Sequence, residues 1–436
     1  MKTLLTTQKI SYIFFITLLF LFGLMGCSSN QPYQIELMAT PEVFIAGPDP
    51  FKDTPASHKN NTIQILYATD RKPVKQGDDE AFYENERGYV LRLGYGKVDI
   101  GNNTSWKLLK KASLQTDRDT SLSLQVTQIN ELGILDSTYS KFELHQDIQN
   151  ISQQPKKEYA KLINNQLARS QQKDIYIYVH GYKVIFEDPL LVASELWHYL
   201  GYDGVFIAYS WPSTPNKWAY LKDMETGKLS ARNLRLLIEY LASETEVENI
   251  HILGYSAGTR LVTLTLEELA LIHLHNDKET IHKQLKLKNV ILVGSDMDRD
   301  VMGSFEADGF LNVQKHFTVY SSDSDMALNL SSWIFGRRRF SQPFEEGEIH
   351  PLLSSYLWDN DDLIMIDVTH AKDAATGNGH GYFHNSPWVS SDVLMTLKHG
   401  LLPKKRGLER SRKLPVWSFS NASTSHLKAN LKSNKK

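Results

Sequence analysis

From about residue 173 onward, short apolar runs alternate with longer stretches whose apolar residues recur every three or four positions. The longer stretches have the spacing of amphipathic helices and lie at 189–200, 231–242 and 257–275. The short runs predict strands at 175–179, 205–208, 250–253, 290–293, 317–320 and 363–368. Because strands covered on both faces are continuously apolar, this alternation predicts an α/β fold with a mostly parallel sheet between two layers of helices.

The preceding part of the chain has a different pattern. Strands are predicted at 62–67 and 121–129, and a helix at 156–170. The stretch between the strands, 72–110, mixes charged residues with several glycines and predicts a loop and a hairpin. Residues 62–172 are therefore expected to join the sheet as strands, a hairpin and a helix, and residues 173–402 to form the α/β core.

The N-terminus has the pattern of a secretory signal. Lys2 and Lys9 precede an apolar run at 10–24, which ends in small residues before Cys27. A signal peptide at 1–26 explains this order, whereas a transmembrane anchor would need a longer run and a following positive charge. Cys27 is the only cysteine of the chain, so the exported body is expected to have no disulfide, thiolate metal site or cysteine nucleophile.

The residues around Cys27 resemble a bacterial lipobox, Leu24-Met25-Gly26-Cys27, in which the cysteine is acylated with chains such as palmitate. Ser29 is similar to the outer-membrane sorting pattern. We therefore expect a lipoprotein of the bacterial cell envelope, anchored in the outer membrane and facing the periplasm. Residues 27–61 are rich in Pro, Ser, Asn and Gln, and predict a flexible tether after the lipidated cysteine.

Composition and charge limit the partners. The chain is 41% hydrophobic and 22% charged with a net charge of -2, which indicates a globular body and argues against nucleic acid as its main partner. The tail at 403–436 is basic and rich in Ser and Asn, and is expected to be disordered. Two interpretations of this tail remain open, a solvated end and a segment that contacts anionic lipid or an envelope polymer.

The strongest chemical signal is Gly254-Tyr255-Ser256-Ala257-Gly258, between the strand predicted at 250–253 and the helix predicted at 257–275. Gly-x-Ser-x-Gly in a strand–turn–helix context is a nucleophile elbow, which predicts the α/β-hydrolase fold. The two glycines let the strand and the helix approach closely around a strained serine.

A nucleophilic serine needs a base and a group that orients the base. In this fold the order along the chain is serine, acid, histidine. Asp325 follows the strand predicted at 317–320, and His380 lies in a glycine-rich loop after the strand at 363–368. We favour Ser256, Asp325 and His380 as the catalytic residues.

Other residues compete for the same roles. Asp323 is an alternative acid, Asp296 is a further one after the strand at 290–293, and His370 and His384 flank His380. Asp296, Asp298 and Asp300 have the opening spacing of a calcium loop, but Val301 and Ala307 occupy its glycine and glutamate positions. We therefore predict no metal and no cofactor.

An oxyanion hole is expected from two backbone N–H groups. Ala257 would supply one at the start of its helix, and Tyr182 the other in the turn after the strand at 175–179. His180 is expected to fix that turn. Tyr255, Trp211 and His180 are candidates to line the substrate pocket, and the stretch 211–228 is either a lid or ordinary packing.

Several motifs together resemble a bacterial α/β-hydrolase family of unknown function over about residues 63–397. They are Tyr178-Val179-His180-Gly181-Tyr182 with Phe186-Glu187-Asp188, Ser210-Trp211-Pro212-Ser213, the elbow, Asp296-Met297-Asp298-Arg299-Asp300, Asp325-Met326-Ala327-Leu328, and Gly379-His380-Gly381-Tyr382-Phe383. The resemblance implies the same three catalytic residues. Tyr255 and Ala257 stand where the family more often has His and Met, and Lys183 stands where it often has Asn.

The sequence thus predicts an esterase-like or lipase-like serine hydrolase that cleaves a small or lipid-like acyl ester, or a thioester, through an acyl-enzyme. Two alternatives stay open: a catalytically silent binding or scaffold lipoprotein with the hydrolase fold, and an envelope acyltransferase. The oligomeric state is left open.

Overall fold

The computed structural model describes residues 32–74, 82–140, 142, 151–216 and 220–433. The predicted signal peptide, Cys27 and Ser29 lie outside these residues. The fold below is that of the compact unit that begins at Gln34. Within the described ranges, no helix combines the length and apolar character needed to cross a membrane.

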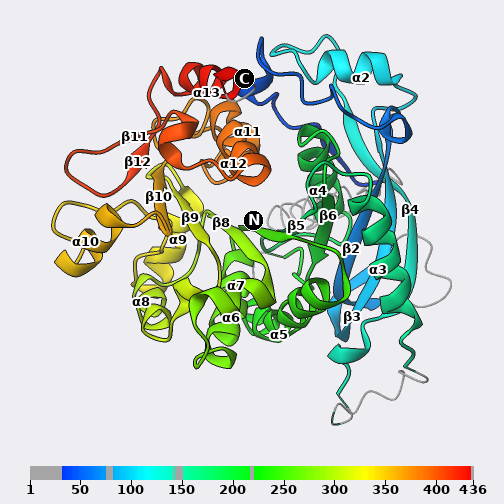
Figure 1. Cartoon of the computed structure of the whole chain (residues 1–436), viewed down its shortest axis with the longest axis horizontal. Helices are drawn as coiled ribbons and strands as arrows, with labels where there is room; N and C mark the ends of the chain where they lie inside the picture. The colour runs from blue at the N-terminus through cyan, green and yellow to red at the C-terminus, as the bar shows by residue number, and fades with distance from the viewer. Residues whose placement is uncertain (1–31, 75–81, 141, 143–150, 217–219, 434–436) are drawn as a thin grey trace, which may run out of the picture. The chain divides into compact units, whose positions relative to one another are not determined.

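The strands of the described residues form one sheet in the order β1-β4-β3-β2-β6-β5-β7-β8-β9-β10-β12-β11 (Figure 1). Their bounds are β1 Gln34–Glu36, β2 Thr62–Pro73, β3 Tyr83–Ile100, β4 Ser123–Ile134, β5 Asp174–Val179, β6 Val205–Ser210, β7 Asn249–Tyr255, β8 Leu287–Val293, β9 His316–Ser321, β10 Leu363–Asp367, β11 Glu409–Arg410 and β12 Trp417–Ser418. All neighbours from β2 to β12 pair in parallel. At the two ends of the sheet the pairing is antiparallel, among β1, β4, β3 and β2 and between β12 and β11.

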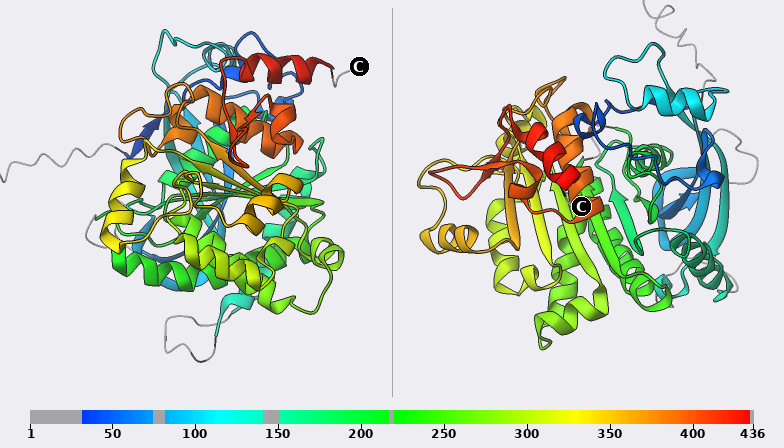
Figure 2. Two further views of the ribbon diagram at one scale, coloured as in Figure 1. Left: turned by 90° about the vertical axis from the view of Figure 1, so that its left-hand side faces the viewer. Right: turned by 45° about the horizontal axis from the view of Figure 1, so that its top comes forward.

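Helices cover both faces of the sheet (Figure 2). Their bounds are α2 Trp106–Ala112, α3 Gln154–Leu167, α4 Asp188–Tyr199, α5 Tyr220–Glu244, α6 Gly258–Ile272, α7 Lys278–Leu285, α8 Arg299–Ala307, α9 Met326–Phe335, α10 Pro351–Asp359, α11 Tyr382–Asn385, α12 Pro387–His399 and α13 Ser423–Ser433. Residues of α4, α12 and α13 share one apolar core, and those of α3, α5, α6 and α7 share another.

Strand β5 shows how the sequence divides between these cores. Tyr176 and Tyr178 point into the first core, whereas Ile175, Ile177 and Val179 point into the second. Every residue of β5 is buried because successive side chains of a strand point to opposite faces and both faces are covered. The predicted α/β fold with a mostly parallel, doubly covered sheet is confirmed.

The predicted tether is wrong for residues 34–61. This segment contains β1, the short 3-10 helices η1 (Glu42–Phe44) and η2 (Ala56–His58), and several buried apolar side chains. The N–H of Met38 donates to Glu195 on α4 at 2.8 Å, and the N–H of Val43 donates to Ser391 on α12 at 3.0 Å. The segment packs because apolar residues are interspersed among its prolines, namely Leu37, Met38, Val43, Phe44 and Phe51.

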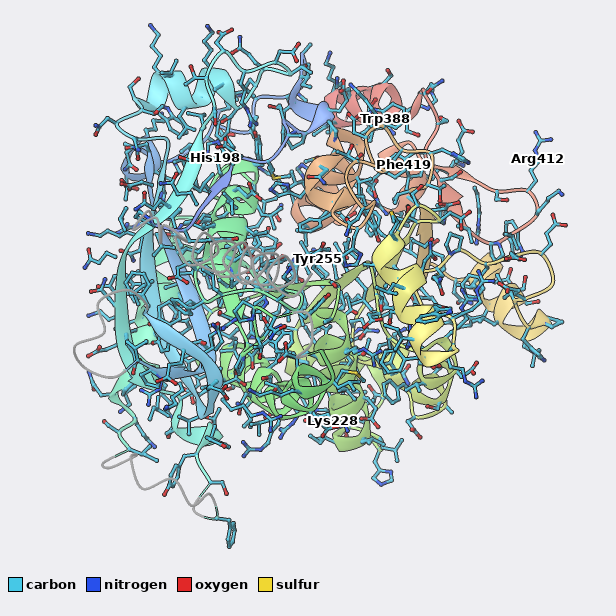
Figure 3. All side chains as sticks on the ribbon, turned by 180° about the vertical axis from the view of Figure 1, so that it is seen from behind. His198, Lys228, Tyr255, Trp388, Arg412 and Phe419 are labelled. Carbon is cyan, nitrogen blue, oxygen red and sulfur yellow. The ribbon has the colours of Figure 1, made fainter. Side chains whose placement is uncertain are left out.

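The predicted disordered tail is also wrong where it is described. β12 extends the sheet beside β10, and Leu427 and Leu431 of α13 are buried. Trp388 of α12 and Phe419 of the tail lie side by side, with ring centroids 6.3 Å apart (Figure 3). The tail was predicted to be disordered because lysine and arginine dominate its composition. Its few apolar residues are nevertheless sufficient to pack the tail against the fold, as the contact of Phe419 with Trp388 of α12 shows.

Two element boundaries also differ from the prediction. The glycine-rich stretch expected to be a loop and a hairpin contains the long strand β3, in which a Cβ at Gly94 would lie 2.4 Å from the ring of Tyr67. Glycine is needed there because β3 passes close to an aromatic ring of β2. Helix α5 begins at Tyr220, well before the predicted start, so the second half of the possible lid at 211–228 is helical.

Candidate active site

Ser256 stands on a sharp turn between β7 and α6. Its φ is +52°, a left-handed conformation that costs a non-glycine residue about 1–2 kcal/mol. A Cβ at Gly258 would lie 2.2 Å from the carbonyl oxygen of His180, so only glycine allows α6 to start this close to the end of β5. The N–H of Ser256 donates to Val293, the last residue of β8, at 2.9 Å. The Gly-Tyr-Ser-Ala-Gly segment therefore has the backbone geometry of a nucleophile elbow.

Asp325 and His380 are bonded to each other. Asp325 is buried at the N-terminus of α9, where Oδ1 accepts from the N–H of Leu328 at 3.0 Å. The other oxygen, Oδ2, lies 2.7 Å from Nδ1 of His380. One carboxylate oxygen thus caps the helix, and this fixes the other oxygen where it orients the imidazole.

The second nitrogen of His380, Nε2, is buried and has no hydrogen-bond partner among the described residues. The structure therefore contains no hydrogen bond between His380 and Ser256. The two residues nevertheless border the same turn: Ser256 bonds to Val293, and a Cβ on the next residue, Gly294, would lie 2.8 Å from Cε1 of His380. Such contacts are often long without substrate and tighten when substrate binds.

Tyr255 holds the other side of the imidazole. Its ring centroid lies 5.1 Å from that of His380 and 4.9 Å from that of Phe383. Tyr255, labelled in Figure 3, is partly buried and packs against the first apolar core, with its ring beside the imidazole of His380. The sequence suggested Tyr255 as a pocket residue, but its ring contacts place it behind the imidazole.

The turn after β5 approaches the serine closely. A Cβ at Gly181 would lie 2.9 Å from Cβ of Ser256, so this glycine permits the turn to approach Ser256. Ala257 is the N-cap residue of α6, and the first N–H groups of a helix have no partner within the helix. Tyr182 and Ala257 both line one cavity beside Ser256. These are the two positions from which the sequence predicted oxyanion donors.

His180 is a fully buried residue that supports the turn. Its Nδ1 lies 2.7 Å from the carbonyl oxygen of Gly181, and its Nε2 lies 3.1 Å from that of Trp211. Its ring stacks on the Trp211 ring, whose Nε1 donates to the His180 carbonyl at 2.7 Å. Burial, with the nearby charge of Arg71, lowers the pKa of His180 well below its usual value. This histidine is a structural part of the turn and does not line the cavity.

We call the cavity beside Ser256 the elbow cavity. It has a volume of about 190 Å³. Its lining residues come from the turn after β5, the segment after β6, and helices α5, α6 and α8 with the residues preceding α8: Tyr182, Trp211, Asp223, Met224, Gly227, Lys228, Ala257, Arg260, Leu264, Met297, Asp298, Val301 and Phe305. Of the three pocket residues suggested by the sequence, only Trp211 lines it. Trp218, in the possible lid, lies outside the described residues.

The rival residues have other surroundings. Asp323 and His370 are exposed. Asp296 accepts a hydrogen bond from Ser331 at 2.5 Å and pairs with Arg260 and Arg339, whereas the imidazole of His380 is bonded to Asp325. Burial raises the pKa of Asp296 to about 6, against the Ser331 hydrogen bond and the charge of Arg339.

His384 belongs to a different pair. Its Nε2 lies 2.8 Å from Oε1 of Glu195, a fully buried carboxylate of α4. Burial alone would lower the pKa of His384, but the surrounding groups, above all the charged carboxylate of Glu195, outweigh burial and raise this pKa to about 9. The imidazole is therefore charged at neutral pH and unsuited to accept a proton.

The sequence did not identify Tyr382 as a part of the site. Its hydroxyl accepts from the N–H of Gly294 at 2.7 Å and donates to the carbonyl of Tyr320 at 3.0 Å. It thereby holds the turn against which the His380 ring lies. Tyr382 is part of the Gly-His-Gly-Tyr-Phe motif, but its hydrogen-bond partners, Gly294 and Tyr320, are far away in the chain and could not be recognised from the sequence.

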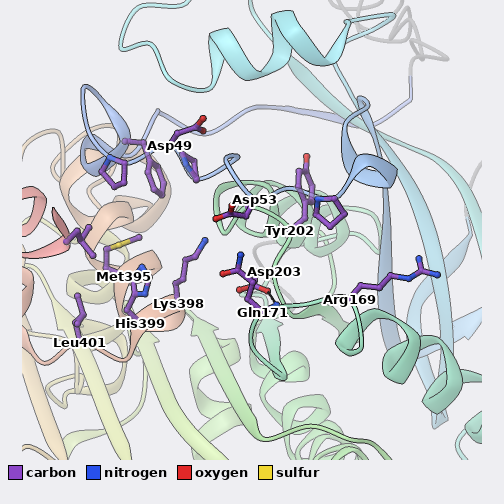
Figure 4. A pocket seen from close by; sticks show the side chains of 16 residues that line it. Asp49, Asp53, Arg169, Gln171, Tyr202, Asp203, Met395, Lys398, His399 and Leu401 are labelled. Carbon is purple, nitrogen blue, oxygen red and sulfur yellow. Dashed lines mark hydrogen bonds between the residues drawn. The ribbon is translucent and has the colours of Figure 1, made fainter. Parts of the chain in front are cut away.

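A larger cavity of about 380 Å³ lies at the opposite ends of the strands (Figure 4). It is lined by Asp49 and Asp53, by Tyr202 and Asp203 just before β6, and by the end of α12. Ser256, Asp325 and His380 line neither cavity, but Ala257, the residue after Ser256, lines the elbow cavity. Since ligands of α/β sheets bind at the carboxyl ends of the strands, the smaller elbow cavity is the better candidate for the active site.

Residues 137–397 match the model of a family described as alpha/beta hydrolases of unknown function (DUF900). No sequence among the curated proteins matches this chain. The match covers more than half of the chain and includes the elbow, the acid and the histidine. The chain therefore belongs to this family of alpha/beta hydrolases of unknown function.

Proposed function

We propose that this protein is a serine hydrolase that cleaves an acyl ester or thioester through Ser256, His380 and Asp325. The observation that carries the proposal is the pair of His380 and Asp325, bonded at 2.7 Å with Nε2 unoccupied, beside a serine at φ +52°. A histidine oriented by a carboxylate through one nitrogen keeps the other nitrogen available to accept the serine proton.

In the proposed reaction, Nε2 of His380 accepts the proton of Ser256 as Oγ attacks the acyl carbonyl carbon. The N–H groups of Ala257 and Tyr182 stabilise the resulting oxyanion, aided by the N-terminal dipole of α6. Imidazolium then returns the proton to the leaving alcohol or thiol as the acyl-enzyme forms. Water, deprotonated by the same nitrogen, releases the acid and restores Ser256.

Labelling with a fluorophosphonate probe tests this proposal. The wild-type protein is expected to be labelled, the Ser256→Ala variant is not, and Ser304→Ala, which removes an exposed serine of α8, is labelled like wild type. Labelling that persists in Ser256→Ala contradicts the assignment of the nucleophile.

One observation favours a second candidate, a silent member of the family that binds ligands without turnover. Nε2 of His380 makes no hydrogen bond to Ser256 in the described structure. This candidate predicts no labelling of the wild-type protein and no ester hydrolysis that depends on Ser256.

We further propose that the protein is a lipoprotein of the cell envelope, anchored through Cys27. Because β1 begins at Gln34, the tether would comprise little more than residues 28–33. Metabolic labelling with palmitate is expected to mark the wild-type protein and to fail in Cys27→Ser, with the variant recovered in the soluble fraction. Equal labelling of both proteins would contradict the anchor.

A further inference from the structure

We infer that the elbow cavity binds the acyl chain of the substrate, and that Gly227 of α5 leaves the room for this chain. The inference rests on the proposed function. Tyr182 and Ala257, the residues proposed to bind the carbonyl oxygen, form part of the cavity wall. A chain attached to that carbonyl would therefore begin at the cavity wall.

The remaining wall is mainly apolar. Apolar side chains come from the segment after β6, from α5, α6 and α8, and from the residues preceding α8, and they include Trp211, Met224, Leu264, Met297, Val301 and Phe305. Such a wall stabilises hydrocarbon by removing it from water.

The charged residues of the wall are two acids and two bases, each with a partner. Asp223 accepts from the N–H and the hydroxyl of Thr214, at 2.8 and 2.9 Å. Asp298 caps α8. Lys228 pairs with Glu225 at 2.8 Å, and Arg260 pairs with Asp296 at 3.1 Å. Because these charges are balanced, the wall favours an uncharged chain over an anionic group.

The size of the cavity limits the chain. An apolar cavity of about 150 Å³ holds a molecule of benzene. The elbow cavity, with about 190 Å³, is therefore expected to hold a chain of roughly six to eight carbons. Each methylene that enters should raise kcat/KM about fourfold, until the chain exceeds the cavity.

Gly227 is buried, yet a Cβ at this position would meet no heavy atom within 4 Å. Space beside a buried residue is interior space, so a side chain at 227 would enter the cavity. Gly303 of α8 offers a matched control, because a Cβ there also meets nothing within 4 Å, but Gly303 is exposed. Leucine favours helix over glycine at both positions, so both substitutions are compatible with folding.

The test measures kcat/KM for p-nitrophenyl esters from acetyl to dodecanoyl. Wild type and Gly303→Leu are expected to prefer chains of about six to eight carbons. Gly227→Leu should shift the optimum to shorter chains and lower the octanoyl-to-acetyl ratio at least tenfold. A flat profile in wild type, or an unchanged ratio in Gly227→Leu, would overturn the inference.

A binding measurement separates this inference from the proposed reaction. The Ser256→Ala protein, which lacks the nucleophile, should bind octanoyl esters more tightly than acetyl esters in calorimetric titration, and Gly227→Leu in this background should remove the difference. If hydrolysis independent of Ser256 is found while this binding holds, the proposed nucleophile fails and the cavity assignment stands. If hydrolysis depends on Ser256 but binding is insensitive to chain length and to Gly227→Leu, the cavity assignment fails alone.

Discussion

Two histidines on the same short segment, His380 and His384, each face a buried carboxylate but differ in which nitrogen the carboxylate uses. Asp325 bonds Nδ1 of His380 and leaves Nε2 without a partner among the described residues. Glu195 pairs with Nε2 of His384, and Nδ1 of this histidine lies 3.3 Å from Oδ1 of Asn385. In the proposed reaction, the carboxylate at Nδ1 prepares His380 to act as a base, whereas the carboxylate at Nε2 holds a charged His384 that links α4 to α11. We therefore assign a proposed chemical role to His380 and a structural role to His384.

The largest expected effect comes from breaking the first pair. Asp325→Asn should lower kcat about 10³–10⁴-fold, because the amide no longer selects the tautomer and orientation of His380. Glu195→Gln should change kcat by less than about fivefold, because Glu195 is not one of the proposed catalytic residues. Steady-state kinetics with one ester checks both variants. A similar loss in the two would show that the pairs do not differ in role.

Breaking the second pair should mainly affect stability. Glu195→Gln leaves His384 without its charge partner and is expected to lower the free energy of unfolding by about 3 kcal/mol. Urea unfolding measures this loss. Glu246→Gln, which breaks an exposed pair with Lys173, is the control and should leave the midpoint unchanged. A wild-type midpoint in Glu195→Gln would contradict the structural role.

The same pair predicts a pH dependence of stability. The folded pKa of His384, about 9, exceeds the usual value of 6.5, so the folded state binds the proton more tightly. The stabilisation is therefore complete below pH 6.5 and is lost as the pH rises through 9, by about 3 kcal/mol. Unfolding by urea between pH 6 and 10 should show this decline in wild type and a smaller one in His384→Gln. Parallel curves for the two proteins would refute it.

The smallest effect should come from the support of the His380 turn. Tyr382→Phe leaves the N–H of Gly294 and the carbonyl of Tyr320 without the hydroxyl, at a cost of about 1–3 kcal/mol of stability, and should reduce kcat about tenfold. Tyr209→Phe removes a buried hydroxyl bonded to Ser230 at 2.9 Å, and should reduce stability but leave kcat unchanged. An equal kcat loss in both variants would exclude a specific contribution of Tyr382.

The apolar pattern was sufficient to predict the central sheet, because fully buried parallel strands such as β5 and β6 are short, mainly apolar runs. It failed where composition conceals long-range packing. Phe44 and Leu431 lie in segments dominated by proline or by basic residues. The helix η1, which contains Phe44, packs against α12, and α13, which contains Leu431, packs against η1. A few apolar side chains with distant partners cannot be recognised from local composition.

Chain order and motif spacing were sufficient to predict which histidine and which carboxylate of the candidate site lie together. The sequence favoured Asp325 over Asp323, and the structure has Asp325 bonded to His380. The roles of Tyr255 behind the imidazole, Tyr382 at Gly294 and Glu195 at His384 depend on contacts between distant segments, which no local pattern encodes. Lys183, where the family often has Asn, adopts a φ of +65°, a conformation that Asn tolerates better than Lys.

The central claim, that His380 activates Ser256, is tested most directly by locating the fluorophosphonate adduct by peptide mass spectrometry in wild type and in His380→Ala. The account predicts one adduct on Ser256 in wild type, and labelling at least about a thousandfold slower in His380→Ala. An adduct on another residue, or labelling of Ser256 at the wild-type rate without His380, would contradict it.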